Sequence, residues 1–137
     1  MKRVGLWIVG VLMVSAAFGM PAHASANDFT ISKFDADYYL GRDTANRSTL
    51  RTVEQITAEF PRFDQNHGIE RALPTTYNGH PTHLHVESVR GSDGQTLSYS
   101  TYDGTNDNLV LRIGDADRYV HGTMTYVITY TQHDVTD

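Results

Sequence analysis

Cysteine is absent from the 137-residue sequence, so disulfides, thiol catalysis and cysteine-ligated metal sites are excluded. Basic residues are also few. Beyond residue 24 there are nine of them against sixteen acidic residues, which gives that part a net charge of 9 − 16 = −7. It therefore lacks the clustered positive charge that a nucleic-acid-binding surface needs. After Phe18 there is also no apolar run long enough to cross a membrane.

What is present at the N-terminus is an export pattern. Two basic residues precede an uncharged apolar run from Val4 to Phe18, and Ala22-His23-Ala24 then fits the small-x-small rule of signal peptidase. The sequence predicts a signal-peptide helix within residues 1–24 and an exported domain over residues 25–137. Ala24-Ser25-Ala26 is a second possible cleavage site.

An uncleaved anchor is the alternative, because the run from Val4 to Met20 is only slightly short of the roughly 20 residues that span a bilayer. In either case we expect the rest of the chain on the extracytoplasmic face of the membrane or secreted. Membrane association would then come from the uncleaved signal or from sequence beyond Asp137. Because the sequence stops at Asp137, just after the last expected strand and before any transmembrane helix, we expect a fragment of a longer protein, and a soluble variant is the alternative.

The rest of the sequence has the pattern of β-strands separated by turns. Residues of 48–60 also recur near helical spacing, but their threonines and the absence of a convincing helix cap favour a strand. Strands are expected at about 28–40, 48–60, 82–89, 97–101, 109–113 and 122–132. Six to seven strands with no persuasive helix predict an all-β, antiparallel, immunoglobulin-like β-sandwich.

The stretch Phe60–Pro74 concentrates charged residues, prolines and a His-Gly turn, and it is predicted to be a shaped connection between the sheets. Strand phase places Glu54 among the core-facing residues of 48–60, where a carboxylate needs a partner. Arg71 is the predicted partner, in a structural pair that pins this connection. The alternative is that Arg71 and His67 bind an anionic ligand at the rim of the sandwich.

Three histidines form a candidate metal site: His80, His83 and His85. On a strand, the last two project from one face about 7 Å apart, and a third imidazole from the turn could complete a zinc or copper site. The alternative is the solvated face of a strand. The acidic turns Asp103–Asn108 and Asp115–Asp117 could bind calcium, but turn chemistry alone explains their composition.

No motif of a catalytic nucleophile occurs. The chain lacks a G-x-S-x-G elbow and an identifiable pair of catalytic carboxylates. The sequence therefore predicts a protein without enzymatic activity.

Three passages carry a resemblance to a known family: Leu50–Ile56, His67–Pro74 and Arg112–Asp117. In order and spacing they resemble the N-terminal extracytoplasmic domain of bacterial predicted membrane proteins, known as domain of unknown function 2207. The resemblance covers nearly all of the chain after residue 24. It implies a cell-envelope protein with this β-rich domain outside and transmembrane helices farther along, and it implies no molecular activity.

Two functions follow as expectations. The first is a non-catalytic extracytoplasmic module that binds a protein partner or its own membrane-embedded remainder. The alternative is a metal- or anionic-ligand-binding sensor that uses His80, His83 and His85, or His67 with Arg71.

Overall fold

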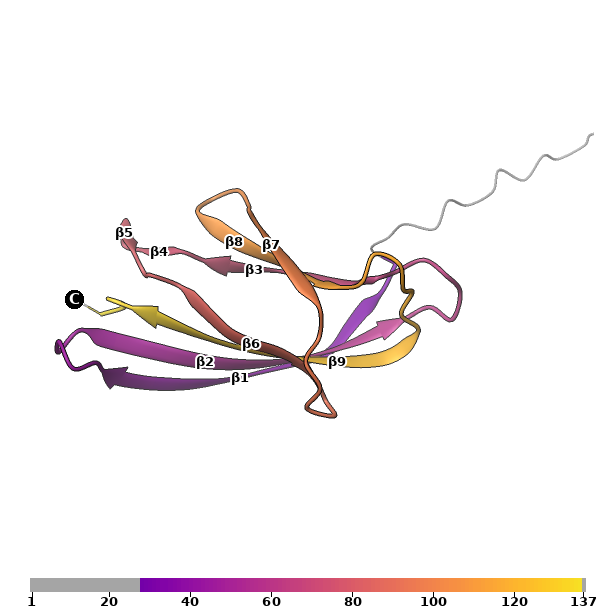
Figure 1. The fold of residues 1–137 in the computed structure, drawn as a ribbon, viewed down its shortest axis with the longest axis horizontal. Coiled ribbons are helices and arrows are strands. Elements are labelled where there is room, and N and C mark those ends of the chain that lie inside the picture. Colours follow the sequence, from indigo (N-terminus) through magenta and orange to yellow (C-terminus); the bar gives the residue numbers. More distant parts are fainter. Residues whose placement is uncertain (1–27, 137) are drawn as a thin grey trace, which may run out of the picture.

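The computed structural model describes residues 28–136 and is built from antiparallel β-strands without a helix (Figure 1). The predicted signal peptide, residues 1–24, lies outside the described residues. In the part that is described, no helix is long and apolar enough to span a bilayer. The prediction of an all-β chain is therefore confirmed over this range.

Two sheets face each other in two layers (Figure 1). The larger sheet has the order β1-β2-β9-β6 and consists of β1 (Thr30–Arg42), β2 (Ser48–Phe60), β9 (Gly122–His133) and β6 (His85–Gly91). The smaller sheet has the order β3-β8-β7 and consists of β3 (Gly68–Pro74), β8 (Asn108–Gly114) and β7 (Tyr99–Asp103). A short ladder joins β4 (Thr76–Tyr77) to β5 (His80–Pro81).

Alternation along the strands explains this arrangement. In β2, every second residue from Ser48 to Phe60 is buried or half-buried, as the strand phase predicts, and Glu54 is among them. The core lies between the sheets, and both contribute to it. Its buried members are Ile56, Ala58, Phe60, Ile69, Leu73, Val89, Leu111, Ile113, Tyr126, Ile128 and Tyr130.

The structure corrects three predictions about the strands. Residues 28–136 contain nine strands, not six or seven, because β3 and the short strands β4 and β5 were not among the strands expected from the sequence. The stretch Phe60–Pro74 is not a connection throughout, since its second half is the strand Gly68–Pro74. The strand expected at 82–89 is shifted to His85–Gly91, and its register slips between Val86 and Ser88.

The order of the strands differs from that of an immunoglobulin constant domain. Without the short β4 and β5, the larger sheet holds the first, second, seventh and fourth strands. The immunoglobulin order places the first, second, fifth and fourth strands together and pairs the seventh with the sixth. Here the last strand instead lies between β2 and β6, at the centre of the larger sheet.

A pair of glycines allows the backbones of β3 and β8 to approach closely at one end of their ladder. Gly68 lies opposite Gly114 in the ladder, and their φ angles are 145° and 137°. A Cβ at Gly68 would lie 1.8 Å from the Ile113 carbonyl oxygen, and one at Gly114 would lie 1.9 Å from the His67 oxygen. Both strands therefore require glycine at this crossing.

Candidate functional site

The first feature of interest is the inner face of β1, which is apolar and exposed. Phe34 pairs with Ile56, and Tyr38 with Thr52, so the even-numbered side chains of β1 share the core-facing side of β2. The sequence correctly places them on one face. However, Phe34, Tyr38 and Leu40 are 49%, 65% and 67% exposed. Nothing in residues 28–136 covers them as the core is covered.

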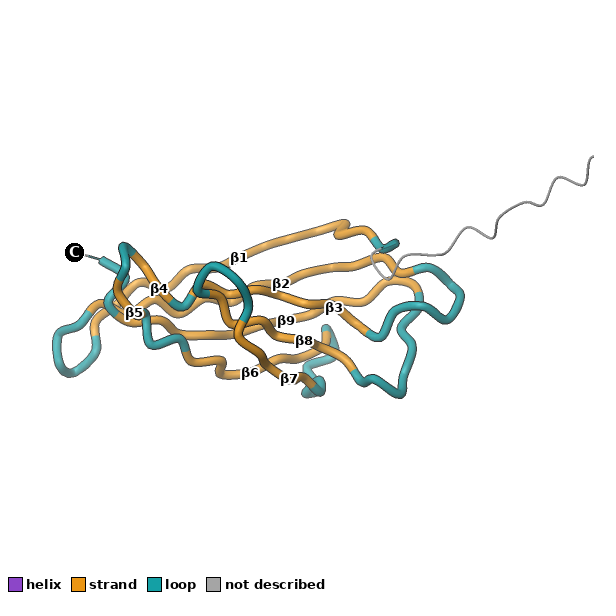
Figure 2. The backbone as a smooth tube through the Cα atoms, turned by 90° about the horizontal axis from the view of Figure 1, so that it is seen from above, coloured by secondary structure: helices purple, strands orange, loops and turns teal. Residues whose placement is uncertain are grey.

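The cause is a sideways offset between the two layers. The core residues of β3 and β8 pack over β2 and β9, whereas β1 projects beyond them, as the view from above shows (Figure 2). The guanidinium of Arg71 on β3 reaches back over β1, with its Cζ 5.7 Å from the centre of the Phe34 ring. The apolar inner face of β1 is therefore exposed because the smaller sheet does not extend over it.

Beside this surface lies the ion pair between Glu54 and Arg71. The guanidinium donates from Nε to Glu54 Oε2 and from Nη2 to Oε1, each at 2.7 Å, so the pair is bidentate. Tyr130 Oη donates to the same Oε1 at 2.8 Å. Glu54 is only 1% exposed, and it thus receives three hydrogen bonds in the core. The structure brings together the two residues that sequence reasoning paired.

The surroundings shift the pKa values of the two partners of Glu54. The hydrogen bonds that Arg71 donates to Glu54 raise the pKa of the guanidinium above its ordinary value. Burial, followed by the hydrogen bond to Glu54, raises the pKa of Tyr130. Burial alone raises the pKa of Tyr126, four residues before Tyr130 on β9, to about 12. Both tyrosines are therefore neutral and Arg71 is charged at physiological pH.

Arg71 and His67 do not lie in one pocket. The remaining Nη1 group of Arg71 donates to the carbonyl oxygen of Ala72 at 2.9 Å. His67 lies at the far end of the sandwich, where it lines a cavity of about 650 Å³ that Arg71 does not line. The two residues proposed together for an anionic ligand thus face different surroundings.

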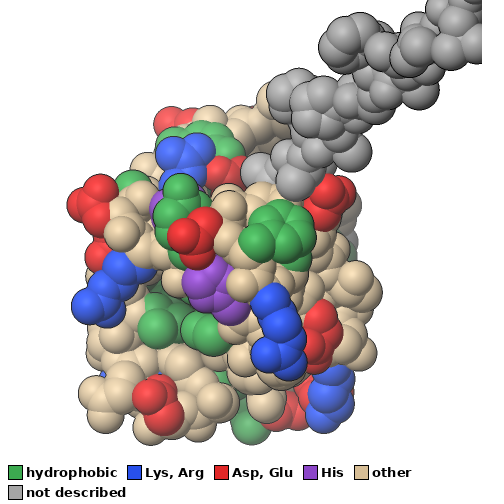
Figure 3. Space-filling model, turned by 90° about the vertical axis from the view of Figure 1, so that its right-hand side faces the viewer, with side chains coloured by type: hydrophobic (Ala, Val, Ile, Leu, Met, Phe, Trp, Pro, Cys, Tyr) green, Lys and Arg blue, Asp and Glu red, His purple; other side chains and the backbone are tan. Residues whose placement is uncertain are grey.

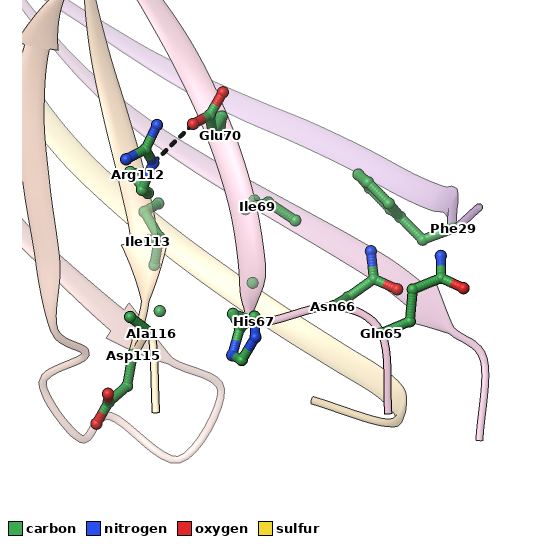
Figure 4. Close-up of a pocket in the computed structure, with 12 residues that line it drawn as sticks. Phe29, Gln65, Asn66, His67, Ile69, Glu70, Arg112, Ile113, Asp115 and Ala116 are labelled. Carbon is green, nitrogen blue, oxygen red and sulfur yellow. Dashed lines mark hydrogen bonds and ion pairs between the residues drawn. The ribbon is translucent and has the colours of Figure 1, made fainter. Parts of the chain in front are cut away.

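The cavity beside His67 lies at one end of the sandwich and is lined by residues of β3 and β8, by the loop residues next to these strands and by Phe29 (Figure 4). His67 Nδ1 donates to the carbonyl oxygen of Arg118 at 2.8 Å, and its ring stacks on Tyr119 at 4.3 Å between centroids. On the other side of His67 is a second cavity of about 390 Å³. Histidine and hydrophobic side chains gather on this end of the molecule, with charged side chains around them (Figure 3). In this arrangement His67 holds two loops together.

The three histidines of the candidate metal site are all exposed. His80 lies in β5 and His85 begins β6, but His83 is between strands, with a left-handed φ of 48°. The expectation that His83 and His85 project from one strand is therefore wrong. Within the described range, no group of three or more histidine or acidic side chains is arranged to hold a metal ion.

The acidic turns have internal hydrogen bonds. Asp115 accepts a bond from the Asp117 amide at 2.9 Å, as a turn-forming aspartate does. In the other turn, the side-chain amide of Asn108 donates to the Thr105 carbonyl at 2.9 Å. Turn chemistry accounts for both sequences.

Sequence reasoning found Glu54 and Arg71 but missed the exposed face of β1. Phe34, Tyr38 and Leu40 alternate with polar residues just as the covered residues of β2 do, so the pattern carries no sign of exposure.

The chain was also compared with known proteins. No family model, no curated protein and no solved structure matches it.

Proposed function

We propose that this chain is a non-catalytic, exported β-sandwich module of the cell envelope whose role is to bind another protein. In this proposal, residues 1–24 direct export and residues 25–137 form the extracytoplasmic domain of a longer membrane protein. The domain is immunoglobulin-like in its two-layer architecture, with its own strand order. The signal pattern of the N-terminus and the family resemblance of three sequence passages support this placement.

The exposed inner face of β1 carries the proposal. Phe34, Tyr38 and Leu40 point to the side on which the rest of the larger sheet is covered, yet about half or more of each is exposed. Scattered apolar residues are ordinary on a protein surface, but a contiguous row on the open side of a sandwich is typical of an interaction site. The partner is another envelope protein or the membrane-embedded remainder of the same protein.

The contacts of the charged residues favour this function over a ligand sensor. All three terminal groups of Arg71 donate to Glu54 or Ala72, so an anion would have to compete with a buried carboxylate. An apolar surface has no such competitor.

Site-specific photocrosslinking in cells that export the chain tests the proposal. A photoreactive residue replaces Tyr38, and in a control it replaces Tyr102, which is 42% exposed on β7 of the smaller sheet. We expect a discrete protein adduct from position 38 and none from position 102. Mass spectrometry of the adduct separates another protein from the chain's own continuation, and either supports the proposal. No adduct at position 38, or the same adduct at both positions, would contradict it.

A further inference from the structure

The outer edge of β1 is the longest unpaired strand edge in the described part of the chain. Strand β1 has 13 residues and pairs only with β2, whereas the edge strands β3, β6 and β7 have 7, 7 and 5. A row of backbone N–H and C=O groups on such an edge is ready to pair with another strand.

The other edge strands have features that oppose such pairing. Strand β3 ends in Pro74, which has no N–H group, and the register of β6 slips between Val86 and Ser88. The ladder of β1 is irregular only between Ile31 and Lys33, near its start. From Lys33 onward β1 pairs regularly with β2.

The two faces of β1 define what a partner strand needs. On the inner face, Phe34, Tyr38 and Leu40 favour apolar neighbours. On the outer face Asp35 and Asp37 are exposed, and the single Lys33 lies 2.6 Å from Asp35. Side chains directly opposite in an antiparallel pair lie about 4.5–5.5 Å apart at Cβ, so each face is matched residue by residue.

We propose that β1 binds an extended segment of a partner protein by antiparallel strand addition, and that this segment alternates apolar with lysine or arginine residues. The proposal rests on the proposed function and specifies its partner. The apolar residues extend the row of Phe34, Tyr38 and Leu40, and the basic residues lie beside Asp35 and Asp37. Backbone hydrogen bonds supply affinity, and the alternating side chains supply selectivity.

Charge favours such a partner over a second copy of the chain. Residues 25–137 carry a net charge of −7, so two copies repel each other. Pairing of two β1 strands about Ala36 would also place Asp35 opposite Asp37 of the second copy. Like charges directly opposite each other destabilise a ladder.

The test uses a synthetic peptide with blocked ends in which valine and lysine alternate. The peptide is added to the isotope-labelled full chain, residues 1–137. Nuclear magnetic resonance measures the affinity and the exchange of each backbone amide. We expect alternate amides of β1, those directed away from β2, to exchange more slowly when the peptide is bound. The Tyr38→Ser/Leu40→Ser variant should bind about tenfold more weakly or worse. The Phe63→Ser variant, which changes a loop residue that is 56% exposed, should bind as the wild type does.

A charge exchange provides the second arm. A peptide that alternates valine with glutamate should bind the wild type at least about tenfold more weakly than the lysine peptide. The Asp35→Lys/Asp37→Lys variant should reverse this preference. Added salt should weaken the binding of the lysine peptide to the wild type, because the charges of Asp35 and Asp37 are exposed.

Three results would overturn strand addition. They are no binding of the lysine peptide, binding without protection of β1 amides, and a dimer of the unliganded wild type that forms through β1. The photocrosslink from position 38 is independent of these results. A partner adduct without peptide binding would leave the proposed function standing and refute the strand mode, whereas the loss of both would refute both.

Discussion

The buried carboxylate of Glu54 depends on side chains that are far away in the sequence. It is 1% exposed, and it accepts two hydrogen bonds from Arg71 of β3 and one from Tyr130 of β9. A buried charge that loses its partner keeps the cost of its desolvation, so removing one side of such a pair is far more costly than the pair's net contribution.

Arg71→Ala should therefore lower the free energy of unfolding by about 3 kcal/mol, at the low end for buried pairs because Arg71 is partly exposed. The matched control is Arg112→Ala. Arg112 forms an exposed ion pair with Glu70 at 2.8 Å, and its loss should cost much less than the loss of Arg71, because water screens an exposed pair. Urea denaturation measures both variants. Equal stabilities of the two would show that Arg71 does not pin β3 to the larger sheet.

Two tyrosines on the inner face of β9 offer a second comparison. Tyr126 and Tyr130 are 2% and 5% exposed, but only Tyr130 donates to a carboxylate. Among the described residues, no hydrogen-bond partner lies near the Tyr126 hydroxyl. Tyr130→Phe should thus lower the free energy of unfolding by about 1.5–3 kcal/mol, whereas Tyr126→Phe should leave it unchanged or raise it by about 1 kcal/mol. The reverse order in chemical denaturation would contradict these contacts.

The buried Tyr126 also predicts a loss of stability at alkaline pH. Its pKa rises from 10.0 to about 12 on folding, so the unfolded chain releases this proton first. The stabilisation is complete below pH 10 and is lost as the pH rises toward about 12. Denaturation measured across this window should show a smaller fall in stability for Tyr126→Phe than for the wild type. An identical fall would show that Tyr126 does not titrate as a buried group.

At the scale of elements, the crossing of β3 and β8 depends on two glycines. A methyl group at Gly68 would meet the Ile113 carbonyl oxygen at 1.8 Å, and backbone cannot give way as a flexible side chain can. Gly94 has a positive φ of 81° as well, but an added Cβ there would meet nothing within 4 Å. An alanine at Gly68 thus suffers both a steric clash and an unfavourable backbone conformation, whereas an alanine at Gly94 suffers the unfavourable backbone conformation alone.

Gly68→Ala should lower the free energy of unfolding by more than about 3 kcal/mol, because strain and a clash add. Gly94→Ala should cost about 1–2 kcal/mol from its backbone conformation alone. Thermal unfolding followed by circular dichroism compares them. If Gly68→Ala were as stable as Gly94→Ala, β3 and β8 would not approach as closely as the structure has them.

The strands that the sequence predicted best have uninterrupted alternation. The bounds of β2, Ser48–Phe60, and its buried face follow from a period of two. In β6 the same reasoning failed, because a register slip breaks the period between Val86 and Ser88. Strand β3 was missed because its Arg71 and Pro74 resemble loop chemistry, although the strand lies at an edge where proline is tolerated.

At the scale of the whole molecule, the candidate site depends on how the two sheets are placed. Glu54 could be paired with Arg71 from sequence because a buried carboxylate demands a partner and Arg71 lies in the ordered stretch that follows β2. The exposure of Phe34 and Tyr38 could not be predicted from sequence, because it results from the offset between the sheet of β3 and the sheet of β1 (Figure 2). Local alternation specifies which residues share a face, and only the packing of distant strands specifies whether that face is covered.

The acidic residues on the edge strand β1 are predicted to keep copies of the molecule from pairing with each other. Exposed edge strands are prone to pair with other copies, and charged residues on the edge oppose this. With Asp35→Asn/Asp37→Asn, β1 keeps its apolar face and Lys33 but loses both carboxylates, so repulsion between copies decreases. Sedimentation velocity at increasing concentration should show more dimer for this variant than for the wild type.

Asp93→Asn/Asp103→Asn, which removes the same charge from a turn and from the end of β7, is the matched control and should stay as monomeric as the wild type. If both double variants associate equally, net charge and not the edge of β1 controls association.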